Sequence, residues 1–175
     1  VGRWHPKKGV TALLKAYDIL NEQLSTISCF NLVLIGPSRA EVEIYFNRQG
    51  RTTPYWLYPL GELHGRQKWA ALSQARFFIL PSYQEGFPVS VIESLASGTP
   101  VVVSKQCNIE VSSSRAIVVL DEVEPSSISH TILNLGRVGN MEILREDARN
   151  AAKAYYDIDN VIKSLHGLYQ EVLKG

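Results

Sequence analysis

The chain has 175 residues, of which 45% are hydrophobic and 20% are charged, a composition typical of a globular domain with its own core. Its 18 Lys and Arg residues nearly balance its 17 Asp and Glu residues, so the net charge is +1. This balance argues against the strongly basic surface that binds nucleic acid or anionic membranes. We expect no nucleic-acid partner, although a local anion site is compatible with this charge.

The two cysteines, Cys29 and Cys107, form no CxxC pair and have no histidine at metal-ligand spacing. We interpret both as free thiols in a reducing cytosol. No apolar run approaches the roughly 20 residues that span a bilayer, and no signal peptide is visible.

Short, uniformly apolar runs bounded by turn residues are typical of parallel strands that are buried on both faces. A first strand is expected to end at Val1. The others, in chain order, cover residues 32–35, 56–60, 77–80, 101–103 and 116–120.

Helical patterns separate these runs. The apolar stripes are Val10, Leu13, Leu14, Tyr17 and Leu24, then Ile92, Leu95 and Ala96, and finally Val161, Leu165, Leu168, Tyr169 and Val172. Pro125 and Asn140 are residue types that begin helices. The alternation predicts an α/β fold, a doubly wound, Rossmann-like parallel sheet with helices on both faces, in a single domain over 1–175. Ligands of such sheets bind beyond the carboxyl ends of the strands.

The first candidate site lies between the expected first strand and the first helix, in Gly2-Arg3-Trp4-His5-Pro6-Lys7-Lys8-Gly9. Two lysines at a helix amino end oppose the helix dipole, which favours anions there. An anion held by Arg3, Lys8 and the helix amides would remove this conflict. The alternative is that both lysines point into water at a small cost, and the cluster alone does not decide between the two.

The second candidate site is the segment from Pro81 to Glu93, which follows a buried strand. Pro88 suits the first position of a helix. The amides of Val89 and its neighbours would then be free to bind a phosphate. Glu85 lies before this helix end and Glu93 more than a turn inside it. Two carboxylates flanking an anion site match the layout of a sugar nucleotide, which has hydroxyls on either side of its diphosphate.

The same segment resembles the signature of the group 1 retaining glycosyltransferases of GT-B architecture. The matching residues are Pro81-Ser82, Glu85-Gly86-Phe87, the second carboxylate Glu93, the Ser97-Gly98-Thr99-Pro100-Val101-Val102 stretch, and Gly2-Arg3 with Lys8-Gly9. The resemblance runs over essentially the whole chain, and the two glutamates eight positions apart are highly specific in this context.

The resemblance implies a role for each matching residue. Arg3 and Lys8 would hold the donor diphosphate, and Glu85 would contact hydroxyls of the transferred sugar, so these three are the expected catalytic residues. Glu93 would bind the ribose hydroxyls. The remaining donor-binding residues would be Gly86, Phe87, Pro88 and Val89, with Gly61 and Glu62 near the base.

The resemblance also implies how the whole protein works. The chain would be a C-terminal nucleotide-sugar-binding domain, with an N-terminal acceptor-binding domain absent from this chain. Partners would be a nucleotide sugar, that N-terminal domain, and an acceptor that is a glycan, a lipid or a small molecule. The protein would be cytoplasmic, or peripheral at the membrane through the N-terminal domain. No cofactor and no metal are expected, and the isolated chain should transfer no sugar.

Two other readings stay open. One is a nucleotide-sugar epimerase or phosphorylase on the same architecture, although no motif for a pyridoxal phosphate lysine is visible. The other is a non-catalytic module that binds a sugar nucleotide, because its donor site would look the same.

Several other features of the sequence bear on the site. Asp157-Ile158-Asp159 has the DxD pattern of metal sites, but we expect Asp159 to cap a helix instead. No partner is evident for any of the four histidines, and only His5 lies near the expected site. The family has a Gly-containing loop where this chain has residues 105–110, which lack glycine. This difference affects the expected shape of the site near the sugar and phosphate.

Overall fold

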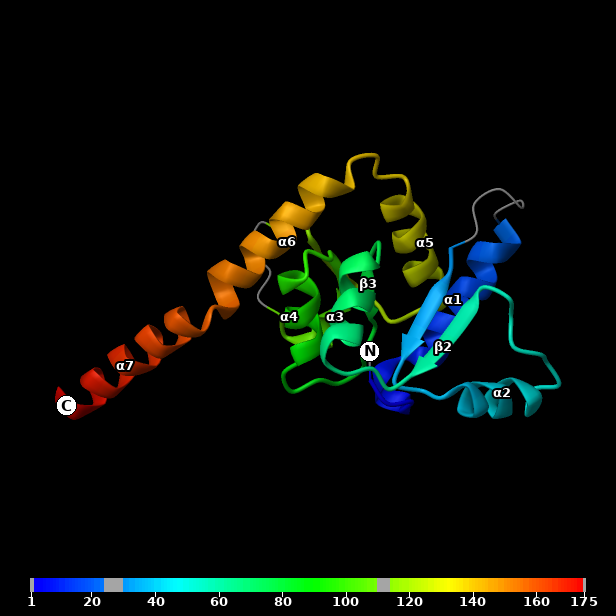
Figure 1. Cartoon of the computed structure of the whole chain (residues 1–175), viewed down its shortest axis with the longest axis horizontal. Coiled ribbons are helices and arrows are strands. Elements are labelled where there is room, and N and C mark those ends of the chain that lie inside the picture. The colour runs from blue at the N-terminus through cyan, green and yellow to red at the C-terminus, as the bar shows by residue number, and fades with distance from the viewer. Residues whose placement is uncertain (1, 24–29, 110–113, 175) are drawn as a thin grey trace.

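The computed structural model describes residues 2–23, 30–109 and 114–174. Figure 1 shows a body of strands and helices from which the last helix extends as an arm. The strand that we expected to end at Val1 lies outside the described residues, as do Leu24 and Cys29. Within the described part, strands and helices alternate along most of the chain, as predicted.

All described strands pair in parallel. Each begins and ends within one residue of its predicted bounds. They are β1 (Leu32–Ile35), β2 (Leu57–Gly61), β3 (Phe78–Leu80), β4 (Val101–Ser104) and β5 (Ile117–Leu120). In the described residues they form two sheets, β1-β2 and β3-β4-β5, rather than the single sheet that we expected.

An apolar cavity of about 450 Å³ separates the two sheets and is lined by β1 and β3. In a doubly wound sheet of order 3-2-1-4-5-6, the first strand lies in the centre, between the second and the fourth. The Gly2 amide donates to the Ile35 carbonyl (2.8 Å), just as the Gly36 amide donates to the Gly61 carbonyl (2.7 Å) at the end of β2. Gly2 therefore leaves the sheet region at the edge where β1 and β2 also end.

The helices cover both faces of the sheets. They are η1 (Pro6–Lys8), α1 (Val10–Gln23), α2 (Arg39–Asn47), α3 (Gly65–Gln74), α4 (Val89–Ala96), η2 (Lys105–Cys107), α5 (Pro125–Gly136), α6 (Met141–Tyr156) and α7 (Ile158–Lys174). Side chains of β4 alternate between two buried cores, as successive strand residues must. Val102 packs with α1 and α5, whereas Val101 and Val103 pack with α4 and α6.

Local chemistry explains where several helices begin. Pro125 is the first residue of α5, and Asn140 accepts the Glu142 amide at the start of α6 (3.1 Å), as predicted. The cap of α7 is Asp157 and not Asp159, because the Asp157 carboxylate accepts the Asp159 amide (2.9 Å). Ser38 and Glu41 form a reciprocal capping box at α2, and these hydrogen bonds lower the pKa of Glu41.

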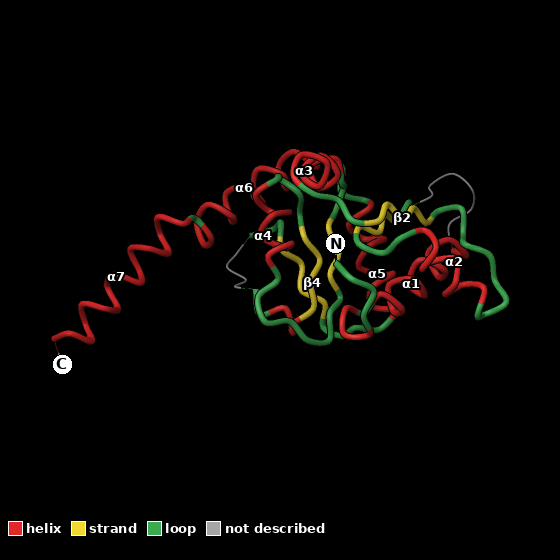
Figure 2. The backbone as a smooth tube through the Cα atoms, turned by 60° about the horizontal axis from the view of Figure 1, so that its bottom comes forward, coloured by secondary structure: helices red, strands yellow, loops and turns green. Residues whose placement is uncertain are grey.

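The last helix, α7, projects from the body with the C-terminus at its far end (Figures 1 and 2). The predicted apolar stripe is present on it. Its members are all exposed, from 47% for Val161 to 71% for Val172. The periodicity correctly predicted a helix, but the stripe does not pack against the core. Among the described residues, no helix is both long and apolar enough to cross a membrane.

Candidate functional site

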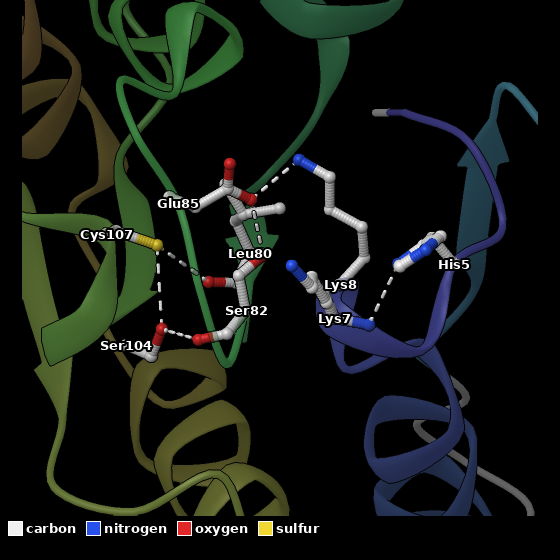
Figure 3. A network of polar contacts seen from close by, with 8 residues as sticks. All are labelled: His5, Lys7, Lys8, Leu80, Ser82, Glu85, Ser104 and Cys107. Carbon is white, nitrogen blue, oxygen red and sulfur yellow. Dashed lines mark hydrogen bonds and ion pairs between the residues drawn. The ribbon is translucent and has the colours of Figure 1, made fainter.

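The loop before α1 is shaped by a short helical turn. The His5 ring nitrogen Nδ1 accepts the Lys7 amide (3.2 Å) and caps η1. Our view that the histidines have no partner is therefore wrong for His5, and it is also wrong for His64 and His130, which contact Glu62 and Asn134. Gly9 ends η1 in the left-handed conformation, at φ 65°, and its carbonyl accepts the Leu13 amide. This turn directs the Lys8 side chain toward Glu85, in the loop between β3 and α4 (Figure 3).

The loop between β3 and α4 is anchored from below by a buried polar network (Figure 3). Ser104, at the end of β4, donates its hydroxyl to the Ser82 carbonyl (2.5 Å). The Cys107 thiol, fully buried, lies 3.5 Å from the Leu80 carbonyl and 3.5 Å from the Ser104 hydroxyl. Cys107 is a free thiol, as we expected, and it packs beneath the loop that carries Glu85.

The two candidate sites meet in space. The Lys8 ammonium lies 2.6 Å from Oε1 of Glu85, and the Ser82 hydroxyl donates to the same oxygen (2.6 Å). The Glu85 side chain is only 9% exposed. Its other oxygen, Oε2, has no partner among the described residues and can accept a hydrogen bond from a ligand hydroxyl.

Backbone contacts hold the same two loops together. The Tyr83 amide donates to the Lys7 carbonyl (2.7 Å). A Cβ atom added at Gly9 would lie 1.9 Å from the Pro81 carbonyl oxygen, so the backbones touch there. Only a glycine fits this contact, which explains why a lysine followed by glycine precedes α1.

The amino end of α4 differs from our prediction in two respects. Pro88 is the N-cap residue and not the first helical residue, and α4 begins at Val89. The Val89 amide donates back to the Phe87 carbonyl (3.0 Å), so it is not free to bind a phosphate. Within the described part of the chain, the amides of Gly86, Phe87 and Ser90 make no hydrogen bond. The amino end of α4 also has no side-chain cap. An anion can therefore accept hydrogen bonds from these amides.

Further along α4, the Glu93 carboxylate faces α3. Lys68 places its ammonium 2.5 Å from Oε2 of Glu93, and each side chain is 24% exposed. The contact is an ion pair whose angles do not meet those of a hydrogen bond, so the buried Oε2 accepts no hydrogen bond from a described residue.

The other predicted site residues are less constrained. Arg3 is exposed, lines the cavity between the sheets together with Lys8, and makes no polar side-chain contact within the described residues. The Gly61 amide donates to the Pro37 carbonyl (3.0 Å), so it holds the β1–α2 loop instead of facing a ligand. Glu62 is exposed and lies 3.7 Å from His64. Phe87 is exposed as well, with its ring against that of Tyr156.

Sequence reasoning missed three residues that the structure adds to this region: Lys68, Ser104 and Cys107. Ser104 and Cys107 contact backbone carbonyls at the start of the loop that carries Glu85. No pattern in the sequence marks a residue that anchors a distant loop. Lys68 left a weak signal, because the first turn of α3 contains basic residues and no acidic one. That conflict with the helix dipole resembles the one that drew attention to Lys7 and Lys8.

The described residues contain no group of three His, Cys, Asp or Glu side chains that could hold a metal ion. Asp157, which we set aside as half of a DxD pattern, is occupied in capping α7.

Comparisons with known proteins show which family the chain resembles. The family model for glycosyl transferases group 1 matches residues 1–155. The O-antigen chain mannosyltransferase B of Escherichia coli is 29% identical over 134 residues, which cover 76% of this chain and 35% of that protein. The putative teichuronic acid biosynthesis glycosyltransferase TuaC of Bacillus subtilis (strain 168) is 26% identical over 178 residues, covering 99% of this chain and 42% of that protein.

Solved structures show the same fold. A sucrose-phosphate synthase from Thermosynechococcus elongatus has a TM-score of 0.78 at 20% identity, covering 99% of this chain and 44% of that one. WaaG, a glycosyltransferase involved in lipopolysaccharide biosynthesis, has a TM-score of 0.72 at 17% identity, covering 90% and 42%. The chain thus spans less than half the length of these proteins. Its α/β fold matches the corresponding part of the GT-B structures. By its sequence match over residues 1–155, the chain belongs to the group 1 glycosyltransferase family.

Proposed function

We propose that this chain is the donor-binding domain of a retaining glycosyltransferase that takes its sugar from a nucleoside diphosphate sugar without a metal ion. The acceptor would bind to a separate N-terminal domain. The nucleotide would lie across the carboxyl ends of the strands, with its diphosphate at the amino end of α4, its sugar at Glu85 and its ribose at Glu93.

The pairing of Lys8 with Glu85 is the observation that carries this proposal. A cation for a phosphate and a carboxylate for a sugar hydroxyl lie side by side, next to an uncapped helix end with free amides. A diphosphate placed there would meet Lys8, Arg3 and these amides together. In the Lys8–Glu85 pair, each partly buried charge compensates the other.

The chemistry follows from what each group can do. The bond between the anomeric carbon of the sugar and the diphosphate oxygen breaks, and the same carbon bonds to the acceptor oxygen on the same face. The acceptor proton passes to an oxygen of the leaving diphosphate. Lys8 and Arg3 stabilise the negative charge that develops on that diphosphate, and Glu85 orients the sugar.

Thermal unfolding of the 175-residue chain tests the proposal. We expect at least one of UDP, GDP, ADP and dTDP, or one of their sugar conjugates, to raise the Tm in the presence of EDTA. A ligand at 100 times its Kd adds about 2.7 kcal/mol, which is roughly 5 to 10 °C for a chain of this length.

Neighbouring lysines provide the matched control. Lys8→Ala should abolish the rise in Tm, whereas Lys7→Ala, at an exposed side chain on the same turn, should leave it intact. Binding that disappears in EDTA and returns with Mg²⁺ or Mn²⁺ would contradict the metal-independent donor site. No rise with any of these nucleotides would contradict the proposal itself.

A further inference from the structure

The ion pair between Lys68 and Glu93 lies where the proposed site would recognise the ribose of a nucleotide. Two partly buried helices, α3 and α4, pack against one another and bring these side chains together. Both side chains are 24% exposed, so neither has the conformational freedom of a fully solvated surface residue.

Lys68 occupies an unfavourable position within its own helix. It lies in the first turns of α3, where the helix dipole disfavours a positive charge. His64, at the N-cap position, makes no capping hydrogen bond, and the first turn contains no acidic residue. The Glu93 carboxylate from α4 supplies the negative charge that α3 lacks.

The two oxygens of Glu93 are in different environments. Oε2 is buried and lies against the Lys68 ammonium. The side chain as a whole keeps 24% of its surface exposed, and Oε2 contributes almost none of it. Oε1 is therefore the carboxylate oxygen that a ligand hydroxyl can reach, and the contact with Oε2 restricts rotation of the carboxylate.

We infer that Lys68 is a positioning residue for nucleotide recognition, which holds Glu93 by Oε2 and so aims Oε1 at a ribose hydroxyl of the donor. The inference rests on the proposed function, which places the ribose at Glu93. Lys68 does not contact the nucleotide in this arrangement. It therefore governs how well the site distinguishes a ribose from a deoxyribose, and not how well it holds the diphosphate.

Calorimetric titration with the nucleoside diphosphate that binds best, and with its 3′-deoxy analogue, measures this distinction as a ratio of two Kd values. A charged hydrogen bond of about 1.5–3 kcal/mol gives wild-type protein a ratio of about tenfold or more. Glu93→Ala should bring the ratio close to one.

Lys68→Met should lower the ratio to within about twofold of one and leave the Kd of the 3′-deoxy analogue unchanged. Lys68→Arg, which keeps the charge, should restore most of the ratio, and Lys15→Met, at an exposed lysine on α1, should not change it. Lys68→Met added to Glu93→Ala should have no further effect, because the residue acts through Glu93. Lys68→Gln provides a second neutral variant should Lys68→Met fold poorly.

The outcomes separate this inference from the proposed function. Suppose that wild-type protein binds the two ligands with different Kd values and that Glu93→Ala removes this difference. If Lys68→Met then leaves the ratio of the two Kd values unchanged, Lys68 has no positioning role. If Lys68→Met weakens both ligands equally, Lys68 contacts the nucleotide directly and the inference is wrong. If wild-type protein binds both ligands equally, the ribose contact of the proposed function fails and this inference fails with it.

Discussion

Replacing Gly9 with alanine should destabilise the chain by about 2–5 kcal/mol, the largest effect that we expect from a single methyl group. The residue has φ 65°, a left-handed conformation that costs an alanine about 1–2 kcal/mol. The new Cβ would also lie 1.9 Å from the Pro81 carbonyl oxygen, which belongs to backbone and cannot turn aside. The loop that carries Glu85 would have to move away from Lys8, so nucleotide binding should be lost as well.

Gly50 provides the matched control for this change. It has nearly the same conformation, at φ 66°, and a Cβ added there meets no atom within 4 Å. Gly50→Ala should therefore show only the conformational cost of about 1–2 kcal/mol and keep nucleotide binding. Chemical denaturation of both variants gives the comparison. Equal losses of stability in the two variants would show that the contact between Gly9 and Pro81 is not close.

Replacing Glu85 and Glu93 in turn should produce two different ligand profiles. Glu93→Ala should weaken a nucleoside diphosphate and its sugar conjugate by a similar factor of about tenfold or more, because both ligands contain the ribose. Glu85→Ala should weaken the sugar conjugate by about tenfold or more and not weaken the bare diphosphate. The Lys8–Glu85 pair sharpens this expectation, since removing Glu85 frees Lys8 for the phosphate.

Calorimetric titration of both variants with both ligands measures these profiles. Glu43→Ala, at an exposed carboxylate on α2, serves as the control and should change neither affinity. Identical profiles for Glu85→Ala and Glu93→Ala would rule out the linear arrangement of sugar, diphosphate and ribose, even though the family membership would stand.

Part of this fold was predictable because a central strand such as β4 is buried on both faces. Parallel strands in that environment become continuous apolar runs, and the run at 101–103 corresponds to β4 with one residue added. Periodicity also predicted α7, but it gives the direction of an apolar face and not its partner. The exposure of that face, at Leu168 for example, could therefore not be read from the sequence.

The site was predictable to the extent that its residues are close in sequence or match a known motif. Spacing and resemblance singled out Lys8, Glu85 and Glu93, and the structure brings the first two into contact. The Lys68–Glu93 pair joins two different helices, so no local pattern could have predicted it. The hydrogen bond from the Val89 amide to the Phe87 carbonyl depends on the dihedral angles of the turn, which residue types alone do not determine.

The location of the bound nucleotide is the most direct test of the proposed donor site. Amide chemical shifts of the 175-residue chain, recorded by NMR during titration with the nucleoside diphosphate that binds best, report where it lies. We predict the largest changes at Lys8, Gly86 and Ser90, around the amino end of α4, with smaller changes near Glu93. Changes confined to the strands that line the cavity between the sheets, such as at Val33 and Phe78, would contradict a donor site built by Lys8, Glu85 and α4.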